Sequence, residues 1–116
     1  MLIRSQDKET LINFNNSIAV NTMVDIGGVT KMFCSYSCDD YVIGHYSSKE
    51  KAMKVLDMIQ EAYGDSEYTK YVIPEVCRIL SMKPKTEENK AHAGELGEML
   101  KKGMTFQMPA DSEVEV

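Results

Sequence analysis

The stretch IAVNTMVDIGGVTKMFCSYSCDDYVIGHYSSKEKAMKVLDMI, residues 18–59, changes its hydrophobic period partway along and thereby indicates the fold class. From residue 18 to residue 26 the residues alternate with a period of two, which is typical of a half-buried strand. Gly27-Gly28 then permits the positive φ of a tight hairpin turn. After Ser47 the apolar residues are three and four apart, as on one face of an amphipathic helix. The stretch therefore predicts strands followed by a helix.

Working outward toward the N-terminus, residues 2–5 and 10–14 flank a polar group and read as a hairpin. Residues 29–37 and 41–46 read as the strands that follow the glycine turn. Because every link is short, neighbouring strands are expected to pair antiparallel. The sequence thus predicts an α+β domain with a five-stranded antiparallel curled sheet or a small barrel.

Toward the C-terminus, we expect a first helix over residues 48–63, with Ser47 and Glu50 as a capping box and Gly64 as its stop. Residues 67–73 are left open between helix and strand. Pro74 can start a helix at its first position or kink a longer one, and we favour a separate helix over 74–82.

A further helix is expected from Thr86 to Lys101-Lys102, with Gly103 as its stop. Residues 104–108 alternate apolar and polar and predict a short last strand that returns to the sheet. The prediction is one domain over residues 1–109, followed by an acidic flexible tail at 110–116.

Composition narrows the class of protein. The 116 residues carry a net charge of −5, and no segment is strongly basic, so a nucleic-acid polymer is not an expected partner. No apolar run reaches the ~18–20 residues that cross a bilayer, so no membrane is expected. Three cysteines and no leader-like N-terminus favour free thiols and a cytoplasmic location.

No pattern indicates catalytic chemistry or a cofactor. Cys34 and Cys38 are four apart without a second close pair, so a zinc site is not expected. His45 lies in a predicted strand and His92 on a polar helical segment, and neither accompanies a nucleophile and an orienting acid. We therefore expect no catalytic residue, no metal ligand and no cofactor.

Residues that can bind a small anionic or aromatic ligand are present. Lysines crowd the start of the first helix, where they can hold a phosphate or simply form a solvated face. Tyr68, Tyr71 and Phe106 can offer a stacking surface, although Phe106 and one tyrosine can equally be core. Our candidate ligand-binding residues are Arg4, Lys51, Tyr71, Arg78, Asn89 and Phe106.

Three stretches together carry a family resemblance. They are residues 2–7 (LIRSQD), residues 43–56 (IGHYSSKEKAMKVL) and residues 106–109 (FQMP). They resemble small proteins of phages and prophages in Gram-positive bacteria, and among these the phage anti-Thoeris sponges of the first described type. Residues 65–103 look like a variable insertion. The matching motifs look structural, so the resemblance transfers no binding residue to this chain.

The resemblance implies a fold similar to a decorated small β-barrel of the WYL or Sm-like kind, assembled as dimers or hexamers. It also implies a function: binding cyclic ADP-ribose-like signals, and in some members cyclic oligonucleotides, without cleaving them. The alternative is a protein-binding inhibitor of the anti-restriction or anti-CRISPR type, whose acidic surface occupies a basic nucleic-acid channel. The third hypothesis is an enzyme that degrades a nucleotide.

Overall fold

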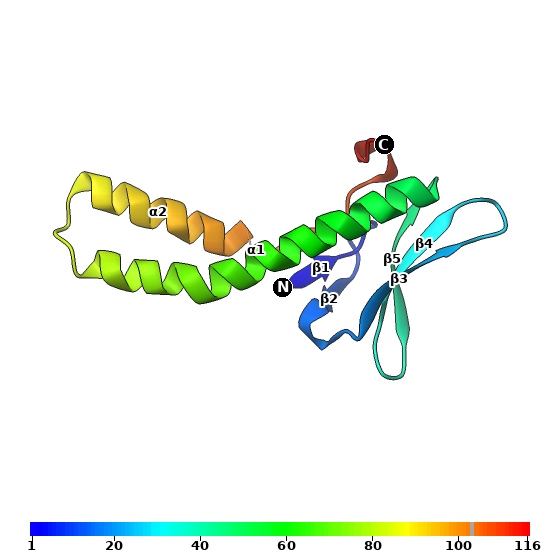
Figure 1. The fold of residues 1–116 in the computed structure, drawn as a ribbon, viewed down its shortest axis with the longest axis horizontal. Helices are drawn as coiled ribbons and strands as arrows, with labels where there is room; N and C mark the ends of the chain where they lie inside the picture. Colours follow the sequence, from blue (N-terminus) through cyan, green and yellow to red (C-terminus); the bar gives the residue numbers. More distant parts are fainter. Residues whose placement is uncertain (103) are drawn as a thin grey trace.

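The computed structural model describes residues 1–102 and 104–116 and has an α+β architecture of two small sheets and two helices (Figure 1). The elements are β1 (Leu2–Arg4), β2 (Leu11–Asn13), η1 (Phe14–Asn16), β3 (Ala19–Val24), β4 (Thr30–Ser35), β5 (Asp40–Tyr46), α1 (Lys49–Ser81), α2 (Glu87–Lys102), β6 (Thr105–Gln107) and η2 (Asp111–Glu113). The predicted class is confirmed.

The first sheet has the order β2-β1-β6. β1 and β2 form the predicted antiparallel hairpin, with Ile3 opposite Ile12. β6 is the predicted returning strand, and it pairs parallel to β1 with Phe106 opposite Ile3. The two ends of the chain therefore meet in one sheet.

The second sheet has the order β3-β4-β5, with both pairs antiparallel. The prediction of one five-stranded sheet is wrong, because β2 and β3 do not pair. Between them lies η1, where the side chain of Asn13 accepts a hydrogen bond from the Asn15 N–H at 3.2 Å and turns the chain. Gln6 links the two sheets, since its N–H donates to the Ile43 carbonyl at 2.8 Å.

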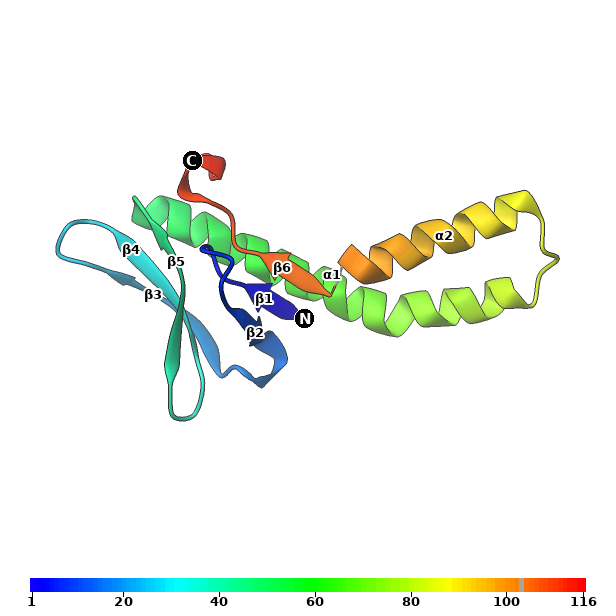
Figure 2. The ribbon, with the colours of Figure 1, turned by 180° about the vertical axis from the view of Figure 1, so that it is seen from behind.

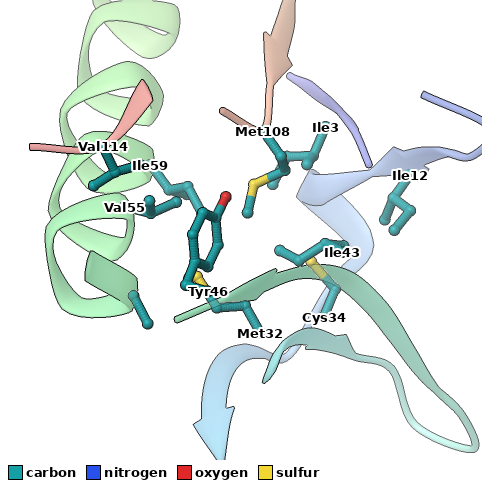
Figure 3. Close-up of a cluster of buried hydrophobic side chains, with 11 residues drawn as sticks. Ile3, Ile12, Met32, Cys34, Ile43, Tyr46, Val55, Ile59, Met108 and Val114 are labelled. Carbon is teal, nitrogen blue, oxygen red and sulfur yellow. The ribbon is translucent and has the colours of Figure 1, made fainter. Parts of the chain in front are cut away.

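The core lies between the sheets and the first half of α1 (Figure 3). Tyr46 is 1% exposed, and its hydroxyl donates to the Pro109 carbonyl at 2.8 Å. Burial raises the pKa of Tyr46 far above its ordinary value, and it raises the pKa of the Cys34 thiol to about 11. The buried cluster comprises Ile3, Ile12, Met32, Cys34, Ile43, Tyr46, Ala52, Val55, Ile59, Met108 and Val114.

α1 is one 33-residue helix where the sequence predicted two with an open segment between them. Gly64 does not end it. Glycine in a helix interior costs about 1 kcal/mol relative to alanine, and here buried residues both before and after it, among them Ile59 and Ile73, hold the helix in place. Pro74 also lies inside the helix, which bends along its length (Figure 1).

The start of α1 differs by one residue from the prediction. Ser48, not Ser47, is the N-cap, and its hydroxyl accepts from the Lys51 N–H at 3.2 Å. The Ser47 N–H instead donates to Asp111 Oδ1 at 2.8 Å. The capping box of Ser47 and Glu50 is therefore replaced by a single serine cap.

The second half of α1 and the whole of α2 extend away from the sheets (Figures 1 and 2). We call residues 64–81 and 87–102 the arm. α2 confirms the predicted helix, while its predicted stop at Gly103 lies outside the described residues. The radius of gyration is 17.6 Å, against roughly 13 Å for a compact domain of this length. The arm makes the molecule elongated.

The segment at 110–116 packs against the body, in contrast to the flexible tail that its composition predicted. Val114 is 5% exposed and belongs to the core cluster. Lys51 Nζ lies 2.9 Å from the Asp111 carbonyl and 3.4 Å from Asp111 Oδ2, and Lys54 Nζ donates to the Glu115 carbonyl. One apolar side chain and two lysines thus fix a segment whose three acidic residues predicted a flexible tail.

Among residues 1–102 and 104–116, no helix combines the length and the apolar character needed to cross a bilayer.

Candidate functional site

A groove of about 460 Å³ lies at the base of the arm, where α1, α2 and β6 meet. Phe106 reaches it from β6, which its pairing with β1 holds in place. Tyr68, on the arm half of α1, is 57% exposed. We call this the aromatic groove; it is lined by Met1, Ala62, Asp65, Tyr68, Thr69, Met99, Thr105 and Phe106. Its walls offer two aromatic rings and one carboxylate.

A second groove of about 720 Å³ adjoins the first, and the two share Met1 and Thr69. We call it the polar groove; it is lined by Met1, Leu2, Asn13, Asn15, Ser66, Thr69, Lys70, Pro74 and Met104. Lys70 supplies a side-chain cation here, and its Nζ is 5.4 Å from the centroid of the Tyr71 ring. A ligand that spans both grooves meets aromatic rings at one end and amides, hydroxyls and an ammonium at the other.

A third hollow of about 360 Å³ lies at the far end of the arm, where α1 turns into α2. We call it the tip pocket; it is lined by Cys77, Leu80, Ser81, Lys83, Pro84, Lys85, Asn89, Lys90 and Ala93. The salt bridges among the described residues use Lys31, Lys51 and Arg78, and none of them uses a lysine of the tip pocket. The pocket is suited to an anionic group.

Asn89 holds the tip in shape. Its Nδ2 donates to the Pro84 carbonyl at 2.6 Å, and its N–H donates to Thr86 Oγ1 at 3.2 Å. Thr86 is therefore the residue that caps α2, as the sequence predicted. Asn89 is both a predicted ligand residue and a brace for the loop that carries two of the lysines.

The other predicted ligand residues do not come together. Lys51 and Arg78 are both on α1, 27 residues and roughly 40 Å apart along the helix axis. Arg78 forms a salt bridge with Glu75, and that hydrogen bond raises the pKa of the guanidinium further. Arg4 is exposed on β1, where its Nε donates to the Lys8 carbonyl at 3.0 Å. Tyr71 is 68% exposed on the arm.

The predicted phosphate position at the start of α1 is filled by the chain itself. Lys51 is engaged by Asp111, whose pKa is lowered first by the hydrogen bond from the Ser47 N–H and further by Lys51. Lys54 donates to the backbone of Glu115. The C-terminal segment therefore occupies the place where the lysine cluster suggested a phosphate.

Sequence reasoning missed the lysines of the tip pocket, Lys83, Lys85 and Lys90. We interpreted the first two only as part of a linker. The available signal was a lysine on each side of Pro84, with a third near the start of the next helix. That these side chains line one hollow depends on the turn between the helices, which the sequence does not specify. Lys70 of the polar groove lay in the segment left open.

Among the described residues, no three histidine, cysteine, aspartate or glutamate side chains converge as metal ligands. Comparison of the chain with models of known families, with curated protein sequences and with solved structures finds no match.

Proposed function

We propose that this protein is a phage-encoded immune-evasion protein that binds and sequesters cyclic ADP-ribose-type signalling nucleotides without cleaving them. In this proposal it acts in the cytosol of the bacterial host and blocks Thoeris defence. The family resemblance of residues 2–7, 43–56 and 106–109 motivates the nucleotide class. The observation that carries it is the aromatic groove with its adjoining polar groove.

The chemistry of these two grooves suits a nucleotide. A purine stacked on Phe106 or Tyr68 gains about 1–3 kcal/mol, and Phe106 is fixed by strand pairing, so little conformational entropy is lost on binding. The amides of Asn13 and Asn15 can bind ribose hydroxyls, and Lys70 can bind a phosphate. The volumes of about 460 and 720 Å³ lie within the usual size range of ligand pockets.

The proposal includes a homo-oligomer, a dimer or a hexamer, because an exposed strip runs along α1. It consists of Tyr68, Tyr71 and Ile79 of the helix and its C-cap residue Met82, which are between 47% and 72% exposed. At 100° per residue these four fall within a sector of about 80°. Ser66, Thr69 and Ile73 are buried on another side of the same helix. An apolar strip of this kind is the usual mark of helix-to-helix association.

Antiparallel pairing of two arms along this strip brings the tip pocket of one copy toward the aromatic groove of the other. Within one chain these sites are too far apart for a single small ligand, since Tyr68 and Ser81 are separated by roughly 20 Å of helix. In the pair, the lysines of one copy can meet the phosphates of a nucleotide whose base stacks in the other. This arrangement explains why one chain carries the aromatic rings and the lysine cluster in different places.

The test is to incubate the protein with a cyclic ADP-ribose isomer made by a TIR-domain protein, separate the bound fraction, heat-denature it and identify the released compound. We expect the isomer to be returned intact. Tyr68→Ala is expected to bind the isomer about 5-fold to 150-fold more weakly, given the stacking energy above, and so to release less of it. Tyr41→Ala is the matched control, because Tyr41 is 46% exposed and lies on β5 in a separate hollow beside Tyr36, away from both rings of the aromatic groove.

A cleaved product would refute sequestration, and unchanged retention by Tyr68→Ala would refute the aromatic groove as the site. The alternative, a protein inhibitor of a host nuclease, predicts that no isomer is retained. The acidic tail that motivated that alternative is partly neutralised in the structure, since Asp111 is paired with Lys51. We therefore rank nucleotide binding first.

A further inference from the structure

Within the part of the chain that the structure describes, β3 is an edge strand, and the backbone groups on its free edge have no partner strand. The hairpin between β3 and β4 closes with the Asp25 N–H donating to the Val29 carbonyl at 2.8 Å, so residue 25 belongs to a hydrogen-bonded pair. In an antiparallel ladder such pairs alternate with pairs whose backbone groups point away from the partner strand. Residues 23, 21 and 19 therefore bond β4, and the N–H and C=O groups of Val20, Thr22 and Val24 point away from it.

The opposite edge of the same sheet supports this assignment and is covered in its C-terminal half. There the outward groups of β5 are those of Ile43 and His45, two residues apart. The Gln6 N–H donates to the Ile43 carbonyl at 2.8 Å. The Gln6 side chain accepts from the His45 N–H at 2.8 Å and donates to its carbonyl at 3.0 Å. One glutamine thus covers the β5 edge as a short extra strand would.

Between Val20 and Val24, β3 has none of the usual protections of an open edge. Natural edge strands are commonly blunted by charged residues, proline or a bulge. Residues 17–24 contain no charged residue and no proline, and β3 pairs with β4 without a register shift. Val24 is 53% exposed and Met23 54% exposed. An uncharged strand of six residues with an open ladder is a template for another strand.

We propose that this edge pairs antiparallel with β3 of a second copy of the chain, about a two-fold axis at Thr22. In this register Thr22 faces Thr22 of the second copy, and Val20 faces Val24 at both ends. All three outward N–H groups of each copy then donate, and all three outward carbonyls accept. Pairing about residue 21 or 23 would use fewer of these groups.

The side chains in this register are also compatible with each other. Threonine opposite threonine and valine opposite valine are favourable cross-strand pairs. On the other face Asn21 lies opposite Met23 of the second copy, and no like charges oppose each other. The β3-β4-β5 sheets of the two copies become one continuous six-stranded sheet across the interface. A second copy is therefore the occupant that matches the edge in both backbone and side chains.

This interface is independent of the nucleotide proposal and of the strip on the arm. β3 lies in the body, whereas the residues of the strip belong to the arm, which extends away from the sheets (Figure 2). Each contact on its own joins two copies by a two-fold axis. Where both form, each chain has two different two-fold partners, and the assembly grows beyond a dimer into a closed dihedral ring or an open chain.

Residue-level amide exchange of the wild-type protein tests the pairing within one strand. The amides of Asn21 and Met23 bond β4 and serve as internal controls that are protected in any folded form. The amides of Val20, Thr22 and Val24 are expected to exchange at least about 100-fold more slowly than their unstructured rates at high protein concentration, and to lose that protection on dilution.

Val24→Lys is the disrupting variant, because it places a charge opposite Val20 of the second copy while altering a side chain that is already half exposed. Val42→Lys on β5, at 48% exposure, is the matched control. We expect Val24→Lys to abolish the protection at Val20 and Thr22 and to reduce the assembly mass in light scattering, with Val42→Lys unchanged. Unprotected amides at Val20 and Thr22 in the wild type would overturn the proposal. So would protection that survives both dilution and Val24→Lys, because it would then arise within one chain.

Discussion

Replacing Val114 with alanine tests whether the C-terminal segment is part of the folded body. Val114 is 5% exposed and lies beside Val55 and Ile59 of α1 (Figure 3). The substitution removes two buried methyl groups, worth about 0.8 kcal/mol each. The cavity they leave adds to this cost, because the surrounding side chains relax only partly. We expect the free energy of unfolding to fall by about 2 kcal/mol.

The assay is urea unfolding followed by circular dichroism, at one fixed protein concentration because association raises apparent stability. Val116→Ala is the control: the same substitution in the same segment, at a side chain that is 79% exposed. We expect it to change the free energy of unfolding by less than about 0.5 kcal/mol. Equal midpoints for Val114→Ala and the wild type would show that the segment contributes nothing to the core, and would restore the interpretation of a free tail.

Three further predictions follow from the same contacts. Gly64→Ala should stabilise the protein by up to about 1 kcal/mol in thermal or urea unfolding, because a Cβ there meets nothing within 4 Å and the residue is inside a helix; destabilisation would mean that the helix ends there. Tyr46→Phe should lower the free energy of unfolding by about 1 kcal/mol. A carbonyl left without any donor would cost up to about 3 kcal/mol, but the Pro109 carbonyl keeps a hydrogen bond from Gln6 Nε2 at 3.3 Å. The pKa of Asp111 is lowered in the folded protein, so its stabilising contribution is present above about pH 4 and is lost as the pH falls through the folded-state pKa. The difference in unfolding midpoint between the wild type and Asp111→Asn should therefore shrink on acidification. A difference that stays constant with pH would contradict this linkage.

Elements built by local pattern were predictable. The β1–β2 hairpin, the glycine turn between β3 and β4, and the start of α2 at Thr86 all follow from turn and capping residues within a few positions of one another. The returning strand at Phe106 was also visible as a short alternation. Each of these depends on sequence neighbours, which is why one sequence is enough to predict them.

Elements decided by contacts over long sequence distances were not predictable. Gly64 and Pro74 are local signals against a helix, yet α1 continues through both because Ser66, Thr69 and Ile73 are buried against other parts of the chain. The candidate site also depends on contacts between residues that are far apart in the sequence. Phe106 and Asn89 were named from chemistry and do line hollows, whereas Arg4, Lys51 and Arg78 are engaged elsewhere by Lys8, Asp111 and Glu75.

The α+β class and the short hairpins follow from periods of two and 3.6 residues and from turn chemistry, and the uncharged character of β3 can be seen in its residues. Contacts across the fold divide the strands into two sheets, direct the arm away from the body and bury Val114 in the core. These outcomes depend on which faces meet across tens of residues. A hydrophobic period specifies that a face is buried, but not which part of the chain covers it.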